Sequence, residues 1–312
     1  MLNRRHIRIK VMQSIYALIQ SKSDDLVREE KFIHFSIDKI YDLYILMLSL
    51  LVEVRDLAET HLEIGKKKFL ATSDDINPNQ KFIKNRLLLI LKNSPFIKDY
   101  LVKHKLKNWK NDGEYVRVIF DAIKETETYK NYISSDELSF KDDRDFIVTI
   151  FKEVIAPNDK LFDYFESQNI SWVDDLPLVN TTVLKSFSKM SQQKDFTGDP
   201  LYGNDEDRDF VGELFKKVSL HHTEFEKDIN DKTPNWDTDR IAELDLILIK
   251  MALIEFAHFP SIPVRVTINE YIEIAKDYST AKSGFFINGV LDKISKEYTT
   301  SGKMKKSGRG LL

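Results

Sequence analysis

The chain has 312 residues, of which 42% are hydrophobic and 31% are charged, with a formal net charge of −3. This composition is sufficient for one large or two ordinary globular domains with a buried core. Cysteine is absent, which excludes a disulfide framework, a thiolate zinc site and a cysteine nucleophile. Nothing indicates an oxidising compartment, and we expect a cytoplasmic protein.

The charge is unevenly distributed, because no acidic residue precedes Asp24 and none follows Glu297. The basic residues of the two ends are Arg4, Arg5, His6, Arg8 and Lys10, and Lys303, Lys305, Lys306 and Arg309. Clustered cations of this kind can hold polyanions by releasing condensed counterions. The alternative, that basic ends only increase solubility, remains open.

The first predicted element covers residues 9–20, which place their apolar residues on one broad helical face. Arg4 and Arg8 fall on the same angular line, so we expect the first turn to project beyond the core and display its charge. The segment lacks the apolar core and cleavage site of a secretion signal. The most apolar stretch, residues 43–54, contains Ser49 and Glu53 and is too short to cross a bilayer, so no membrane span is predicted.

The following region is also predicted to be helical. A polar stretch at 21–31 precedes a long helical pattern at 32–68, and shorter helices follow at 82–91, 95–103 and 115–124. The sequence Asp-Arg-Asp-Phe at 143–146 recurs at 207–210, and Trp172 recurs as Trp236, both at an offset of 64 residues. This suggests a duplicated helical hairpin whose first copy covers 143–187, although chance similarity remains an alternative.

Residues 188–207 are polar and contain glycine and proline, so they form the best candidate linker. Four helices are predicted after it, at 208–228, 239–256, 267–278 and 283–298. Thr267 and Glu270 have the spacing of a capping box, which predicts the start of the third of these helices.

Several motifs in the first 20 and last 80 residues occur in a specific order. The stretch 245–256 (DLILIKMALIEF) is followed by Ile262-Pro263, by Ile268-Asn269-Glu270 and by 273–276 (EIAK). The closing stretch 283–294 (SGFFINGVLDKI) and the opening residues 4–8 (RRHIR), with Gln13 and Tyr16, complete the pattern. In this order and spacing the motifs resemble the NusB family of antitermination factors over roughly 120 residues.

The resemblance implies an all-α fold, a NusB-like helical bundle with an additional inserted helical region. We expect residues 1–20 to form its first helix with a basic RNA-binding end, and residues 21–203 to form the insertion. Residues 204–300 would complete the NusB-like core, and 301–312 would form a basic flexible tail.

The same resemblance implies the function and the partners. A NusB-like domain would bind the single-stranded boxA element of nascent ribosomal RNA together with a small-subunit ribosomal protein, also called NusE. The pair would act with other Nus factors on the RNA polymerase elongation complex. No cofactor, metal or membrane is implied.

Candidate site residues follow from the basic turn and from the matched motifs. The RNA-binding candidates are Arg4, Arg5, Arg8, Lys10, Gln13, Lys282, Phe286 and Asn288, and the partner-binding candidates are Tyr16 and Glu255. Arginines can contact phosphates, and unpaired bases can stack on an exposed aromatic ring such as Phe286.

Structural alternatives remain for most of these residues. At least one of Phe285, Phe286 and Ile287 must face the core, and Tyr16 lies on the apolar arc of its helix. Asn288 could be a buried polar group, and Glu255 could form a surface ion pair. The alternative role of Glu270 is to cap a helix. Gly289 would permit close helix packing.

The chain departs from the family in two places. The family often has an acidic residue directly before Ser283, where this chain has Lys282, so RNA affinity, RNA preference or the partner could differ. The insertion is absent from the family core, and the sequence does not indicate its role.

Signatures of catalysis are missing from the sequence. There is no glycine-rich phosphate loop and no His-Glu-x-x-His zinc helix, and the adjacent pair His221-His222 would point about 100° apart on a helix. NusB-like domains also occur in certain RNA cytosine methyltransferases, but these need a nucleotide-type α/β domain and a cysteine nucleophile. A protein-binding scaffold that does not bind RNA is the remaining alternative, and the retained Arg4, Arg5 and Arg8 argue against it.

Overall fold

The computed structural model describes residues 1–22, 25–136, 138–221, 223–233, 241–304 and 306–307. Every regular element in these ranges is helical, so the predicted all-α fold is confirmed. The chain forms two compact units. The terminal unit consists of Leu2–Ile37 and Tyr202–Leu312, and the insertion unit consists of Met1 and Asp38–Leu201. No described helix is both long enough and apolar enough to span a membrane.

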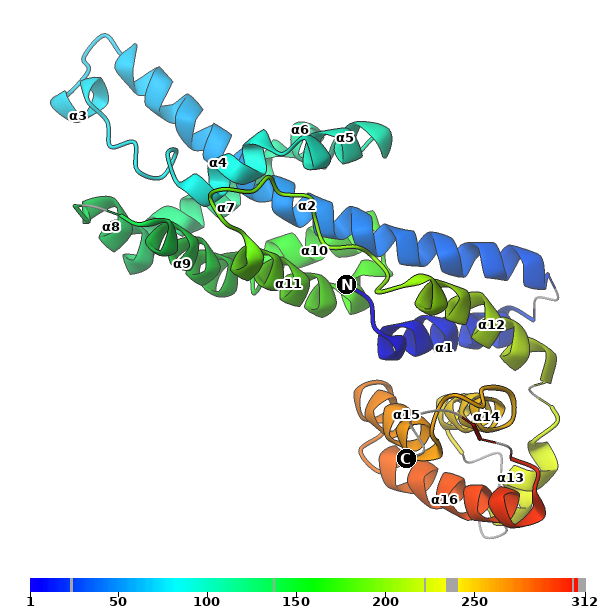
Figure 1. Cartoon of the computed structure of the whole chain (residues 1–312). Helices are drawn as coiled ribbons and strands as arrows, with labels where there is room; N and C mark the ends of the chain where they lie inside the picture. The colour runs from blue at the N-terminus through cyan, green and yellow to red at the C-terminus, as the bar shows by residue number, and fades with distance from the viewer. Residues whose placement is uncertain (23–24, 137, 222, 234–240, 305, 308–312) are drawn as a thin grey trace. The chain divides into compact units, whose positions relative to one another are not determined.

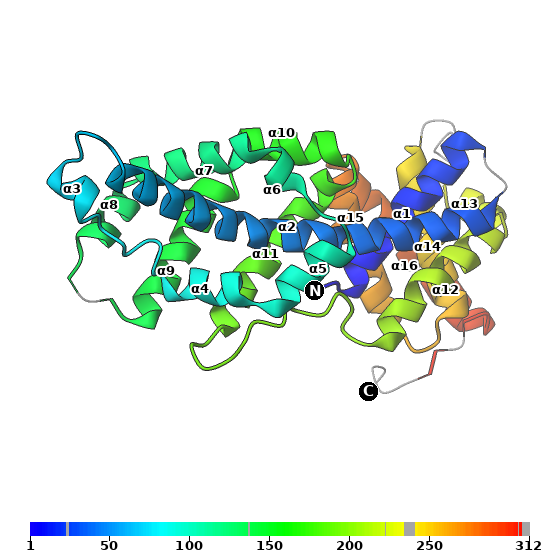
Figure 2. The ribbon, with the colours of Figure 1, turned by 90° about the horizontal axis from the view of Figure 1, so that it is seen from above.

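The helices of the insertion unit follow one another with short connections. They are most of α2 (Leu26–Lys66), α3 (Ser73–Ile76), α4 (Arg86–Asn93), α5 (Pro95–Lys103), α6 (Asn108–Asn111), α7 (Gly113–Glu125), α8 (Glu127–Ser134), α9 (Phe140–Ile150), a π-helical turn η1 (Phe151–Ile155), α10 (Asp159–Gln168) and α11 (Trp172–Lys189). Figure 2 shows α2 between α7 and α10 on one side and α4 and α5 on the other.

Helix α2 is the central element of the insertion unit, because its apolar residues from Leu43 to Leu51 are almost entirely buried. Two tryptophans link neighbouring helices to α2, because their indole N–H groups donate hydrogen bonds to its backbone. Trp109 donates to the carbonyl of Leu46 at 3.0 Å, and Trp172 donates to that of Lys39 at 2.8 Å. The predicted linker after α11 is not helical, but it packs on this unit, since Ser94 Oγ donates to the carbonyl of Phe196.

The terminal unit contains α1 (Arg4–Ser21), the start of α2, α12 (Asp205–His221), α13 (Glu226–Lys232), α14 (Glu243–His258), α15 (Val264–Tyr278) and α16 (Ser283–Ser301). Figure 1 draws α1 and α2 in blue and α12 to α16 in yellow-green to red. Helix α14 is buried on nearly all sides, as its continuous apolar sequence requires. It packs against α1, α12, α15 and α16.

Several predicted boundaries differ from those in the structure. Helix α2 begins at Leu26, and its residues up to Ile37 belong to the terminal unit, where Glu30 pairs with Lys216 of α12. Helix α15 begins at Val264, so Thr267 lies inside the helix, and the predicted capping box is wrong. The helix starts earlier because Pro263, in extended conformation, precedes its first turn.

Within the described residues, part of the predicted tail contacts the end of α14. Lys306 Nζ donates to the carbonyl oxygens of Glu255 and Phe259 at 2.8 and 2.9 Å. These carbonyls lie at the C-terminal end of α14, where the helix dipole favours a cation. The tail therefore caps the central helix. Lys305 and Arg309 lie outside the described residues.

The proposed duplication remains a hypothesis. Phe146 and Phe210 are both buried, as are Phe151 and Phe215. However, α9 continues into a π-helical turn, whereas α12 is α-helical throughout. Trp236, the counterpart of Trp172, lies outside the described residues.

Candidate nucleic-acid interface

The first turn of α1 places its three arginines in two different environments. Asn3 caps this turn, because its side chain accepts a hydrogen bond from the backbone N–H of His6 at 3.1 Å. Arg4 and Arg5 lie at the surface, with 34% and 38% of their side chains exposed, whereas only 2% of Arg8 is exposed. The fixed first turn therefore presents two arginines and buries the third.

Arg8 forms a buried ion pair with Glu255 of α14. Its Nε lies 2.6 Å from Oε1 and its Nη2 lies 2.9 Å from Oε2 of a carboxylate that is fully inaccessible to solvent. Thr267 and Tyr271 of α15 donate to the same carboxylate at 3.1 and 2.8 Å. Burial alone would lower the pKa of Arg8, but the charge and hydrogen bond of Glu255, together with Tyr271 and Glu270, raise it and keep the guanidinium protonated.

This network corrects two sequence predictions. Arg8 is not a surface ligand for phosphate, and Glu255 is not a surface contact for a protein partner, because each satisfies the other in the core. Arg8 follows the apolar line of α1 into the interior instead of projecting beyond it. Lys10, another RNA-binding candidate, is also buried.

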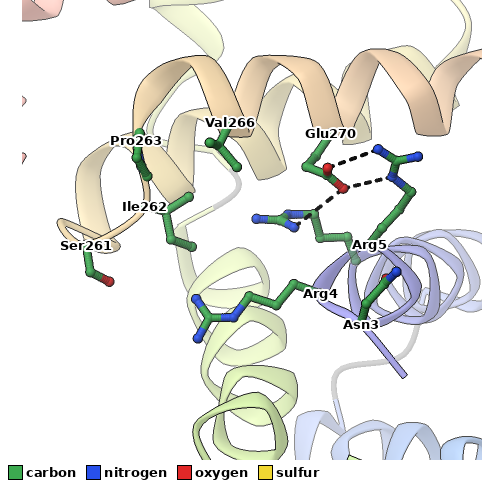
Figure 3. Close-up of a pocket in the computed structure, with 9 residues that line it drawn as sticks. Asn3, Arg4, Arg5, Ser261, Ile262, Pro263, Val266 and Glu270 are labelled. Atoms are coloured by element: carbon green, nitrogen blue, oxygen red, sulfur yellow. Dashed lines mark hydrogen bonds and ion pairs between the residues drawn. The ribbon is translucent and has the colours of Figure 1, made fainter. Parts of the chain in front are cut away.

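Arg4 and Arg5 line a surface pocket of about 480 Å³. Its other wall is made by Ser261, Ile262, Pro263 and Val266, which precede or begin α15. In Figure 3, Arg5 turns toward Glu270 on α15, and Arg4 extends from the same turn in another direction.

Each of the two surface arginines is held by acidic residues. Arg5 makes a two-point contact with Glu270, with Nε–Oε2 and Nη2–Oε1 distances of 2.8 and 3.0 Å. This contact raises the pKa of Arg5 and lowers that of Glu270. Arg4 Nε lies 3.0 Å from Asp207 Oδ1, and its guanidinium lies 5.1 Å from the centre of the Phe210 ring. Both side chains are thus oriented and remain partly open to solvent.

The start of α16 exposes a different aromatic residue from the one predicted. Phe285 is 85% exposed, whereas Phe286 is partly buried and Ile287 is fully buried. Lys282 and Asn288 are exposed, so Asn288 is not a buried polar group. Among the described residues, no neighbouring helix comes within 4 Å of a Cβ added at Gly289. The close approach to α15 is instead made at Gly284, where an added Cβ would meet Ile272 at 3.6 Å.

Helix α15 separates the arginine turn from the start of α16. Arg5 contacts Glu270 on one side of α15, and Gly284 approaches Ile272 on another side. Ser283 donates to Asp245 near the start of α14, while Arg8 binds Glu255 near its end. These two segments therefore do not pack directly against each other but flank α15 within one unit.

The remaining two candidates lie further along α1. Gln13 is partly buried and interacts within the protein. Tyr16 is 41% exposed and is therefore not a core residue. Ile19, one helical turn later, is also exposed.

Comparison with known proteins identifies the family. The sequence model of the NusB family matches residues 182–296. The transcription antitermination protein NusB of Salinibacter ruber (strain DSM 13855 / M31) is 40% identical over 113 residues, which are 36% of this chain and 71% of that protein. The chain belongs to the NusB family.

Two further NusB proteins support this assignment. That of Agathobacter rectalis is 36% identical over 109 residues, covering 35% of this chain and 83% of that protein. That of Chloroherpeton thalassium is 38% identical over 105 residues, covering 34% of this chain and 50% of that protein. No solved structure matches the chain. The NusB family match ends within α16 and does not include α1, so the roles proposed for Arg4 and Arg5 rest on the geometry.

Proposed function

We propose that this chain is a transcription antitermination factor that binds boxA-type single-stranded RNA of nascent ribosomal RNA. It would do so in the cytoplasm, together with the small-subunit ribosomal protein NusE, and would act with other Nus factors on elongating RNA polymerase. The name shared by the curated relatives, transcription antitermination protein NusB, supports this role. The chain would act by binding, without catalysis of its own.

The observation that carries the proposal is the pair of partly exposed arginines at the pocket. Exposed ion pairs contribute little, about 0 to 1 kcal/mol, so phosphates can replace the carboxylates that hold Arg4 and Arg5. A guanidinium that already makes a two-point contact with Glu270 has the orientation needed to bind two phosphate oxygens. The side chains are thus held near the surface in a usable geometry.

The second part of the proposed RNA surface is the start of α16. The exposed ring of Phe285 offers a face on which an unpaired base can stack, and Lys282 adds a positive charge nearby in sequence. An RNA strand that contacts both parts must cross α15, where Glu273 and Lys276 carry opposite charges. Phosphate contacts at the arginine turn and base stacking at α16 would then act on one strand.

For the protein partner, we propose the outer face of α1 as part of the contact. Tyr16 and Ile19 are one helical turn apart, and both expose apolar surface. An exposed tyrosine of this kind suits a protein interface, because it buries a large ring while keeping its hydroxyl group hydrated.

The proposal is tested by titrating labelled boxA-like RNA with the full chain, alone and with the ribosomal partner, at several salt concentrations. For single strands, the logarithm of affinity should fall with the logarithm of salt by about 0.7 per neutralised phosphate. Replacing both Arg4 and Arg5 with Gln should therefore flatten the slope by about 1.4.

A matched control replaces Lys296 and Lys303, which lie at or beyond the far end of α16 from Phe285. This double Gln variant loses the same charge and should retain the wild-type slope. Partner binding without any RNA affinity would overturn the proposal and favour the scaffold alternative. If the two double variants gave the same dependence of RNA affinity on salt, Arg4 and Arg5 would not belong to the RNA surface.

A further inference from the structure

Two histidines and a glutamate converge at one end of the terminal unit. His221 ends α12, Glu224 lies in the turn that follows, and His258 ends α14. His221 Nδ1 lies 2.6 Å from Glu224 Oε1, and the two imidazole rings lie 4.7 Å apart at an interplanar angle of 26°. One ligand atom of each residue lies within 4.8 Å of the other two.

The sequence could not predict this group. His221 and His222 are adjacent, and two adjacent residues of a helix point in different directions, which argued against a shared ion. His222 lies outside the described residues. The structure instead brings His258 to His221 from another helix, 37 residues later in the chain. The second nitrogen ligand therefore depends on tertiary packing.

We propose that His221, Glu224 and His258 bind a divalent transition metal ion, with Zn²⁺ as the representative ion. Two imidazole nitrogens and one carboxylate oxygen form a donor set that suits Zn²⁺ and Co²⁺, and a water molecule would take a fourth position. This site is separate from the proposed RNA surface and does not depend on the proposed function.

The present geometry is open but can close on an ion. Zinc binds nitrogen and oxygen ligands at about 2.0 to 2.2 Å, so the ligand atoms must approach one another to roughly 3.5 Å. The side chains of His221 and Glu224 are 32% and 53% exposed, so rotation of these side chains requires no change in the core. Lys217 brings an opposing positive charge near His258, and the carboxylate of Glu224 offsets part of its effect.

A bound ion would join three segments of the terminal unit. It would connect the end of α12 to the end of α14 through the turn that contains Glu224. The ligand on α14, His258, lies three residues after Glu255 of the buried network. Because the unfolded chain does not hold these ligands together, the ion should bind the folded state preferentially and raise its melting temperature.

The test is a titration of the full chain with Zn²⁺, followed by calorimetry, and with Co²⁺, followed by visible absorption. We expect one ion per chain. Loss of an outer-shell partner typically weakens a metal site by about 10- to 100-fold, and loss of a direct ligand should cost at least as much. His221→Ala, Glu224→Gln and His258→Ala should each show this loss.

The control is His61→Ala, which removes an exposed histidine of the insertion unit and should leave affinity and stoichiometry unchanged. Wild-type affinity in His258→Ala would overturn the proposal, because α14 would then supply no ligand. A loss confined to His221→Ala would overturn it for the same reason.

A second measurement observes the histidine rings of the wild-type chain directly, and variants are needed only to assign the signals. With ¹⁵N-labelled imidazoles, addition of Zn²⁺ should shift the ring signals of two of the seven histidines, which single substitutions then assign. Shifts of no histidine, or of a pair that excludes His258, would contradict the site.

Discussion

Replacing Glu255 with Gln removes the negative charge from the centre of the terminal unit and keeps the size of the side chain. The native carboxylate accepts hydrogen bonds from Arg8, Thr267 and Tyr271 and has no access to water. A glutamine presents an NH₂ group to some of these donors and leaves the Arg8 guanidinium buried. Glu270, 3.9 Å from Arg8 Nη1, is already bound by Arg5 and is too distant to replace the lost charge.

The expected cost follows from the burial of both partners. Removing one member of a buried ion pair typically costs about 3 to 5 kcal/mol. A free-energy change of about 1.36 kcal/mol corresponds to a factor of ten in an equilibrium constant. The equilibrium constant for opening of the terminal unit should therefore rise roughly 100- to 5000-fold. Replacing both partners by apolar residues, as in Arg8→Met with Glu255→Leu, should recover part of this loss, because it removes the buried charge but leaves the hydroxyl groups of Thr267 and Tyr271 without their acceptor.

Native-state hydrogen exchange of the α14 amides measures the free energy of this opening within the terminal unit. A local measurement is needed because a chain with two units need not unfold in one step. Glu273→Gln is the matched control, since it breaks an exposed pair with Lys276 and should have little effect on stability. The reasoning is refuted if Glu255→Gln destabilises α14 by no more than this control. It is also refuted if the apolar double variant is as unstable as the single variant.

Two further predictions concern the proposed RNA surface. Phe285→Ala should weaken RNA binding by about 1 to 3 kcal/mol through lost stacking, with little change in stability because the ring is exposed; unchanged RNA affinity would exclude Phe285. The hydrogen bond from Arg5 lowers the pKa of Glu270, so the folded state holds this proton more weakly than the unfolded state does. The resulting stabilisation is complete above the unfolded value of 4.5 and is lost as the pH falls through the lower folded value. Glu270→Gln should therefore reduce the unfolding free energy at neutral pH by at most about 1 kcal/mol and converge with the wild type in acid, as urea denaturation would show. A difference that persists unchanged in acid would contradict this origin.

The apolar periodicity of the sequence was sufficient to predict most helices of the terminal unit. For Arg8 the periodicity is ambiguous, because a charged residue on the apolar line can either project beyond the core or enter it with a buried partner. Glu255 indicates which of these applies to Arg8. It is the one carboxylate within residues 247–256, which are otherwise apolar apart from Lys250. Two isolated opposite charges on apolar helical faces predict a buried pair only when they are considered together.

Other features depended on tertiary structure and had no local signal. The exposure of Phe285 rather than Phe286 depends on which face of α16 meets α15. Likewise, the pairing of His221 with His258 joins helices that are distant in sequence. The capping box at Thr267 was wrong for a local reason, because Pro263 starts the helix earlier and turns Thr267 toward Glu255.

Photo-crosslinking with 4-thiouridine-labelled boxA-like RNA tests the central claim most directly, because it locates the RNA on the full chain. If the arginine turn and the start of α16 form one RNA surface across α15, peptides that contain residues 2–8 and 282–288 should both crosslink. Crosslinks confined to the insertion unit, or to the far end of α16, would contradict it.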